Sequence, residues 1–168
     1  DLFEENGTAY AVTEYLDGLI LSDFLARNPA MPAASAARNV SLQLCEGVRA
    51  LHGAGLMHLG LGADAVWMCE SGAVKLAAFS CVDLGAGAPA PFLPETSPAT
   101  APPEALCAGD AACAPDIYSL AALMYRMFAG RFPDPAARGQ YLPLASLASG
   151  ADGALAAAVD RALSRDPA

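Results

Sequence analysis

The sequence predicts an α+β fold in which helices predominate. Short strand-like runs lie in the first half of the 168-residue chain, and apolar residues at helical spacing mark the segments 32–53, 116–129 and 152–163. Strands followed by helices are typical of an α+β domain. Hydrophobic residues form 55% of the chain, which is enough to bury a sizeable core.

The first predicted elements are a hairpin and a short helix. Asn6-Gly7 is a favoured two-residue hairpin turn, and the β-rich run 8–13 follows it. Ser22 is the predicted N-cap of a short helix over residues 23–26, because a serine hydroxyl can accept a hydrogen bond from a free N–H of the first turn.

A longer helix and a second hairpin are predicted next. Pro32 suits a first helical turn, and Gly53-Ala54-Gly55 ends the helix. The apolar stripe between them consists of Val40, Leu44, Val48 and Leu51. Two short apolar runs, 65–69 and 73–77, flank a turn that contains a glycine, so they predict an antiparallel pair of strands.

The second half of the chain is predicted to be helical after a long loop. Residues 80–103 are rich in Gly, Pro, Ser and Thr, and a loop of this length in a compact domain is usually functional or mobile. A short helix is predicted over 103–106. The segment 116–129 is apolar on every face, which predicts deep burial. A last helix is expected to begin after Asp152 as N-cap.

The charge balance limits the partners of this protein. Nine Lys and Arg residues against 18 Asp and Glu residues give a formal net charge of −9, so no basic surface for nucleic acid or anionic lipid is expected. Every apolar stretch is too short to span a bilayer, and residues 1–5 do not resemble a signal peptide. We therefore expect a cytoplasmic protein without membrane contact. The five cysteines form no C-x-x-C pair, and neither disulfides nor a metal site are predicted.

Seven segments of the chain follow the order of motifs in one known family. These segments are 11–18, 51–58, 74–80, 101–104, 116–120, 130–133 and 161–167. In that order they resemble the later part of a protein kinase domain of the bacterial serine/threonine type. The matched features include the hinge, the approach to the catalytic loop, the strand before the Asp-Phe-Gly motif, the Ala-Pro-Glu signature and the start of the buried central helix.

The resemblance implies a domain organisation. Residues 1–16 would be a remnant of the small-lobe strands with the hinge, and residues 17–168 would form a protein-kinase-like large lobe. Within that lobe, residues 80–103 would be the activation-segment-like loop.

The resemblance also implies that the catalytic groups are missing. The family's catalytic loop reads His-Arg-Asp-Leu-Lys-Pro-x-Asn. Here the base falls at Gly60, the phosphate-binding lysine at Gly62 and the magnesium-binding asparagine at Ala65. The magnesium-binding aspartate falls at Ala78. Because phosphoryl transfer depends on placing such charges, we expect a catalytically inactive member, a pseudokinase. Asp64 is the alternative base or metal ligand.

Residues at the family's structural positions are retained. By resemblance, His58 and Phe79 belong to the stacked apolar spine, and Asp116 is the acid that holds the catalytic-loop backbone. Glu104 matches an acid that pairs with an arginine, which would fall beyond residue 168. His52, at the end of a helix, is expected to be structural.

A vestigial adenine site is implied at Glu14, Leu16 and Trp67. The first two lie in the hinge, where main-chain groups can still accept adenine. Trp67 falls where the family usually has a leucine beneath adenine, so its larger ring would overfill that site. The alternative is that Trp67 is a core aromatic on a strand. We expect no cofactor, with ATP bound without magnesium as the alternative.

These residues together predict a non-catalytic module that acts by protein–protein interaction or as an allosteric signalling scaffold. Its partner would be a protein, such as an active kinase or another signalling protein. One alternative is a serine/threonine protein kinase with atypical residues that transfers the γ-phosphate of ATP to protein. Another is a fragment without a selected function.

Overall fold

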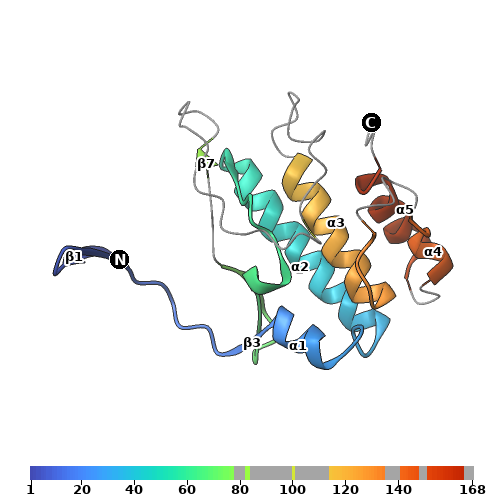
Figure 1. The fold of residues 1–168 in the computed structure, drawn as a ribbon, viewed down its shortest axis with the longest axis horizontal. Helices are drawn as coiled ribbons and strands as arrows, with labels where there is room; N and C mark the ends of the chain where they lie inside the picture. Colours follow the sequence, from blue (N-terminus) through green and yellow to red (C-terminus); the bar gives the residue numbers. More distant parts are fainter. Residues whose placement is uncertain (78–81, 84–99, 101–113, 135–140, 148–150, 165–168) are drawn as a thin grey trace.

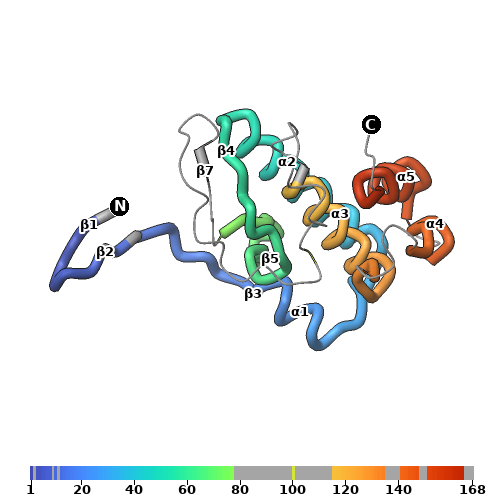
Figure 2. The backbone as a smooth tube through the Cα atoms, turned by 45° about the horizontal axis from the view of Figure 1, so that its top comes forward, coloured from blue at the N-terminus to red at the C-terminus, as the bar shows by residue number. Residues whose placement is uncertain are grey.

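The computed structural model describes residues 1–77, 82–83, 100, 114–134, 141–147 and 151–164. Helices predominate over short antiparallel strands in these segments, which confirms the predicted α+β class. The two long helices α2 (Ala34–Gly53) and α3 (Ala114–Ala129) lie side by side at the centre (Figures 1 and 2). Helices α4 (Leu144–Leu147) and α5 (Gly153–Ala162) pack on α3, whereas the strands and α1 (Leu21–Arg27) lie on the other side.

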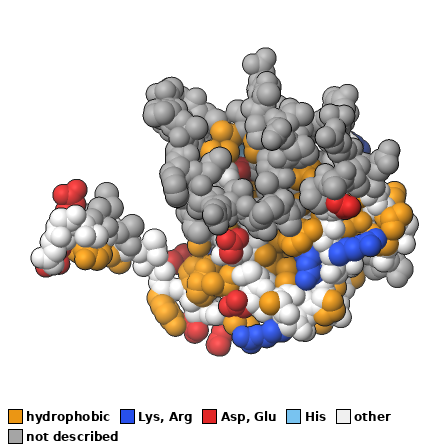
Figure 3. Space-filling model, in the orientation of Figure 1, with side chains coloured by type: hydrophobic (Ala, Val, Ile, Leu, Met, Phe, Trp, Pro, Cys, Tyr) orange, Lys and Arg blue, Asp and Glu red, His pale blue; other side chains and the backbone are white. Residues whose placement is uncertain are grey.

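The chain begins with a hairpin that stands apart from this body. Strand β1 (Leu2–Glu5) pairs with β2 (Thr8–Ala11), which confirms the predicted hairpin. Asn6 and Gly7 both have positive φ, at 53° and 71°, as the tight turn requires. The rings of Phe3 and Tyr10 stack at 5.1 Å and remain about half exposed. The space-filling view shows this hairpin held away from the rest of the molecule (Figure 3).

The body contains a three-stranded antiparallel sheet in the order β3-β5-β6. Strands β5 (Val66–Cys69) and β6 (Val74–Leu76) confirm the second predicted hairpin. Strand β3 (Gly18–Ile20) was not predicted, because three residues show no measurable alternation. Gly18 is required there, since a Cβ at this position would lie 2.1 Å from the Met68 carbonyl oxygen.

Two short strands form a separate pair beside this sheet. Strand β4 (Leu56–Met57) pairs with β7 (Val82–Asp83). After β4 the chain crosses a loop and the 3₁₀ turn η1 (Ala63–Ala65) before it enters β5. This loop runs over residues 58–65 and is called the central loop below.

Helix starts differ from the sequence patterns at α1, α2 and α3. Helix α2 begins at Ala34 with Ala33 as N-cap, so Pro32 lies before the helix and not in its first turn. Helix α3 begins at Ala114, two residues before the predicted start. The predicted N-cap Ser22 is wrong, because α1 begins at Leu21 and its N-cap is Ile20, which has extended backbone and makes no side-chain cap. The buried side chains of Leu21 and Leu25 determine this start. For α5 the expected cap is confirmed, since Asp152 Oδ1 accepts a hydrogen bond from the Ala154 N–H at 2.9 Å.

The hydrophobic core lies between α2, α3 and the sheet. The predicted deep burial of α3 is confirmed, because Leu123 and Met127 are fully buried and contact the same cluster as Leu44 of α2. Val66 of β5 and Leu21 of α1 are buried in the same cluster. In the described segments, no helix combines the length and apolarity that a membrane span requires. The predicted helix 103–106 lies outside the described residues.

Candidate functional site

The central loop is held by one buried carboxylate. Asp116, in the first turn of α3, is 1% exposed. Its Oδ2 accepts a hydrogen bond from the His58 N–H at 2.7 Å, and its Oδ1 accepts one from the Leu59 N–H at 2.8 Å. Charge-assisted bonds of this length are among the stronger ones in proteins. Asp116 therefore sets the position of the loop backbone relative to the central helices.

A histidine from α2 reaches the same carboxylate. His52, in the last turn of α2, lies with Nε2 2.9 Å from Asp116 Oδ2. The Asp116 side chain thus connects the end of α2, the start of α3 and the central loop. These segments are up to 64 residues apart in the sequence.

His58 is fully buried under the loop that it begins. Its Nε2 lies 3.2 Å from the Ala77 carbonyl oxygen, and its Nδ1 accepts a hydrogen bond from the Gly60 N–H at 3.3 Å. A carbonyl can only accept, so Nε2 carries the hydrogen and the ring is neutral. Burial lowers the pKa of His58 below its ordinary value of 6.5, although the charge of Asp116 opposes this.

His58 is therefore expected to make stability depend on pH. Between its lowered folded pKa and 6.5, the unfolded chain binds a proton that the folded chain does not, so the free energy of unfolding falls as pH drops below 6.5. The slope from one such group is at most about 1.4 kcal/mol per pH unit. Urea unfolding of the wild type and His58→Gln from pH 7.5 to 5 measures it. The prediction fails if both proteins lose stability with the same slope.

The backbone of the central loop is unusual at Leu59. This residue has φ of 60°, in the left-handed region, which costs a non-glycine residue roughly 1–2 kcal/mol. Hydrogen bonds from the N–H groups of both His58 and Leu59 to Asp116 hold this conformation. The carboxylate thus offsets a local strain in the loop.

The three predicted catalytic positions of the central loop lie together and carry almost no side chain. Gly60 follows the turn at Leu59, Gly62 is the N-cap of η1, and Ala65 ends η1 with 1% exposure. A Cβ on Gly62 would lie 2.5 Å from Asp64 Oδ1, so the Asp64 carboxylate occupies the space beside Gly62. Asp64 itself is exposed to solvent.

Two of the predicted adenine-site residues, Trp67 and Glu14, lie at one face of the sheet. Trp67 pairs across the sheet with Ile20 and Lys75, so these three side chains share a face. Its neighbours Val66 and Met68 point the other way and pack in or against the core. Trp67 is half-buried and lies on a strand, but on the face away from the core.

The segment around Glu14, which was predicted to be the hinge, is held to this sheet by an ion pair. Glu14 Oε1 lies 2.9 Å from Lys75 Nζ, and this hydrogen bond raises the pKa of Lys75. Both side chains are solvent-exposed, so the pair positions the segment more than it stabilises the fold. Leu16, two residues after Glu14, is half-buried.

Some expected residues fall outside the description and others were missed. Ala78, Phe79 and Glu104 lie outside the described residues. The contacts of His52 with Asp116 and of Lys75 with Glu14 were not predicted, because each joins segments more than 60 residues apart and leaves no local pattern. The described part therefore supplies one anchored loop and one sheet face as the candidate site.

Comparison with known proteins gives the class to which this arrangement belongs. The family model of the protein kinase domain matches residues 1–147. The chain therefore belongs to the protein kinase family. Over 130 residues it is 35% identical to a curated protein of Oryza sativa subsp. japonica named "Putative cyclin-dependent kinase F-2", an alignment that covers 72% of this chain. The chain spans 38% of that relative's length. The bacterial type stays a prediction.

Proposed function

We propose that this chain is a protein-kinase-like module without phosphoryl-transfer activity, which acts by binding another protein. One observation carries the proposal. The buried Asp116 anchors the central loop by two short hydrogen bonds, yet positions 60, 62 and 65 of that loop are Gly, Gly and Ala. The scaffold of a catalytic loop is thus kept without the side chains that its chemistry needs.

The cost of those replacements supports inactivity. Catalysis of phosphoryl transfer relies on charges that are positioned before the reaction. Removing one preorganised group commonly lowers the rate by on the order of 10²–10³-fold. Gly60, Gly62 and Ala65 offer neither a carboxylate, an amide oxygen nor an ammonium group. These three positions therefore supply no side-chain ligand for a magnesium-bound nucleotide.

Trp67 supports a further part of the proposal, which is that adenine is excluded. The indole lies on the sheet face away from the core, beside Lys75, which is bound to Glu14 of the hinge segment. A large ring in this place would fill the space that a planar base needs. Glu14, Leu16 and Trp67 would then mark an adenine site that no longer binds nucleotide.

Thermal unfolding with nucleotide tests both parts. ATP at 100-fold excess over its Kd would stabilise a binding protein by about 2.7 kcal/mol. For a chain of this size the midpoint would rise by roughly 5–10 °C. We expect no magnesium-dependent rise for the wild type and a rise with ATP for Trp67→Leu. Met68→Leu, on the core face of the same strand, is the matched control, and its melting midpoint should not rise with ATP.

Two outcomes would contradict the proposal. A magnesium-dependent rise for the wild type, together with transfer of labelled phosphate to a protein substrate, would show an active kinase. If Trp67→Leu binds ATP no better than the wild type, the exclusion of adenine by Trp67 is wrong. Trp67 is the single tryptophan of the chain, so its fluorescence gives a second readout of binding at this face.

The second candidate is an active serine/threonine kinase with atypical residues. The observation that favours it is the carboxylate of Asp64, which lies beside Gly62 in the central loop. The rice relative is also named a kinase. An Asp64→Asn variant separates the candidates, because it would abolish phosphate transfer if Asp64 replaces the missing base and would change nothing in an inactive module.

A further inference from the structure

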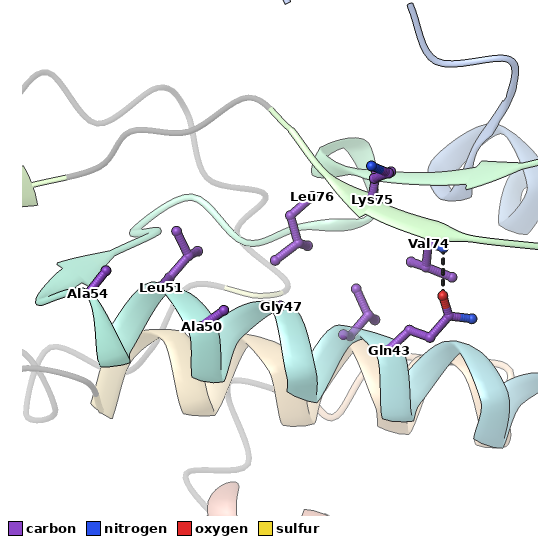
Figure 4. A pocket seen from close by; sticks show the side chains of 9 residues that line it. Gln43, Gly47, Ala50, Leu51, Ala54, Val74, Lys75 and Leu76 are labelled. Atoms are coloured by element: carbon purple, nitrogen blue, oxygen red, sulfur yellow. Dashed lines mark hydrogen bonds between the residues drawn. The ribbon is translucent and has the colours of Figure 1, made fainter. Parts of the chain in front are cut away.

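An apolar groove of about 360 Å³ lies between the second half of α2 and strand β6 (Figure 4). Its helix wall includes the small residues Gly47, Ala50 and Ala54, together with the larger side chains of Gln43, Leu44 and Leu51. Val74, Lys75 and Leu76 of β6 form the opposite wall. A Cβ on Gly47 would lie 3.0 Å from Leu76 Cδ1, so any larger side chain there would begin to fill the groove. Its volume lies within the range of small ligand pockets.

The groove follows one edge of the sheet. Among the strands of the described residues, β6 is an outer strand, because the order is β3-β5-β6. Of its flanking residues, the Ala73 carbonyl accepts a hydrogen bond from the Cys69 N–H of β5, and the Ala77 N–H donates one to the Ala65 carbonyl just before β5, at 2.8 Å each. Antiparallel pairs alternate between bonded and non-bonded, so the peptide groups of Val74 and Leu76 point away from β5 and toward the groove.

A side chain already pairs with one end of this edge. Gln43 Oε1 accepts a hydrogen bond from the Val74 N–H at 2.8 Å, and Gln43 Nε2 donates one to the Gly72 carbonyl at 3.1 Å. Figure 4 shows the amide of Gln43 reaching up from α2 to the strand. It thus replaces the peptide group of a neighbouring strand. Further along, no group of the described residues bonds to the N–H or carbonyl of Leu76.

The dimensions of the groove suit a short extended segment. From Gln43 to Ala54 the helix rises about 16 Å at about 1.5 Å per residue. An extended chain covers about 3.3 Å per residue, so roughly five residues would fit along it. In an added strand, alternate side chains would lie on the small residues of α2, and the backbone would bond to Leu76.

Charge favours one kind of occupant. The chain carries −9, and the exposed Glu46 lies on α2 three residues after Gln43, at the side of the groove. The Lys75 ammonium is engaged by Glu14, and its side chain points away from α2 (Figure 4). A second copy of this chain would also carry −9 and would be repelled. A segment with basic residues would be attracted.

We propose that this groove binds an extended segment of a partner protein, about five residues long, with alternating apolar side chains and adjacent basic residues, which adds as a fourth strand to β6. This proposal rests on the proposed protein-binding function and names the surface that performs it. It does not depend on whether the chain transfers phosphate.

The test uses a fluorescein-labelled peptide with two lysines followed by Leu-Thr-Leu-Thr-Leu. Fluorescence anisotropy should show saturable binding to the wild type, weakened on the order of tenfold or more by Ala50→Leu, which fills the groove. The matched control is Cys45→Leu, because Cys45 is also exposed on α2 but points to another side of the helix. It should bind within about twofold of the wild type. Replacing the two lysines of the peptide by glutamate should weaken binding at low salt.

Hydrogen exchange gives a readout specific to strand addition. The amide of Leu76 should exchange more slowly when the peptide is bound, whereas amides of α5 should not change. The proposal is overturned if the peptide does not bind at concentrations up to about 1 mM, the upper end of weak specific affinities. It is also overturned if Ala50→Leu binds as well as the wild type, or if Leu76 exchange stays unchanged. A dimer in sedimentation that Ala50→Leu dissociates would assign the groove to a second copy instead. Phosphate transfer by the wild type would contradict catalytic inactivity but leave these results standing.

Discussion

Replacing Asp116 by alanine is expected to destabilise the fold by about 3–5 kcal/mol, because it removes a buried acceptor and leaves its partners unpaired. The N–H groups of His58 and Leu59 would both lose their bonds, at 2.7 and 2.8 Å, and His52 would lose its partner. Leu59 would also lose the restraint on its left-handed backbone. Urea unfolding followed by circular dichroism measures the change in free energy.

A matched control shows how much of this cost arises because Asp116 is buried, rather than from the loss of any aspartate that accepts a backbone N–H. Asp152 also accepts a backbone N–H with its carboxylate, but at the exposed start of α5. Asp152→Ala should cost only about 1 kcal/mol, as for other N-caps. Asp116→Asn retains one acceptor oxygen, so its loss of free energy of unfolding should lie between those of the two alanine variants. If Asp116→Ala costs no more than Asp152→Ala, the anchoring role of Asp116 is wrong.

Truncating Leu123 to alanine is expected to cost about 3–5 kcal/mol, because it opens a cavity where α3 meets the rest of the core. The Leu123 side chain is fully buried and belongs to the apolar cluster of the core. For a chain of this size the melting midpoint should fall by roughly 6–15 °C. Differential scanning calorimetry provides the measurement.

The control for this truncation is a leucine on the surface of the other central helix. Leu42 of α2 is 45% exposed, so Leu42→Ala should change the free energy of unfolding by less than about 1 kcal/mol. A cost for Leu123→Ala as small as that for Leu42→Ala would show that the helices are not packed as described.

Local signals predicted several elements well. The hairpin at Asn6-Gly7 follows from the preference of those residues for positive φ, and Asp152 caps its helix through its own side chain. The strand pair β5-β6 follows from two apolar runs around a glycine turn. Each signal lies within a few residues of the structure that it determines.

Elements that depend on distant partners were missed or misplaced. Strand β3 exists because it pairs with β5, almost 50 residues later, and Gly18 is needed only for that approach. The start of α1 is set by the burial of Leu21, which a search for a capping serine could not show. Likewise, nothing near Gln43 in the sequence indicates that its amide pairs with the edge of β6.

The candidate site divides in the same way. Motif order indicated His58, Gly60, Gly62, Ala65 and Asp116 as positions of a kinase-like centre. It could not show that the Asp116 carboxylate bonds to two successive N–H groups, or that His52 joins it. These bonds form only when α2, α3 and the central loop pack together.

The sequence by itself determined the α+β class, the turn chemistry of the hairpins, the apolar faces of the long helices and the order of motifs that marks the protein kinase family. Turn preferences and helical periodicity act over a few residues, so they are readable without a fold. Only the tertiary structure decided the anchoring of the central loop, the face on which Trp67 lies and the groove along β6. Those features depend on contacts across 31 to 64 residues of chain, where burial and backbone pairing, and not local preference, select the geometry.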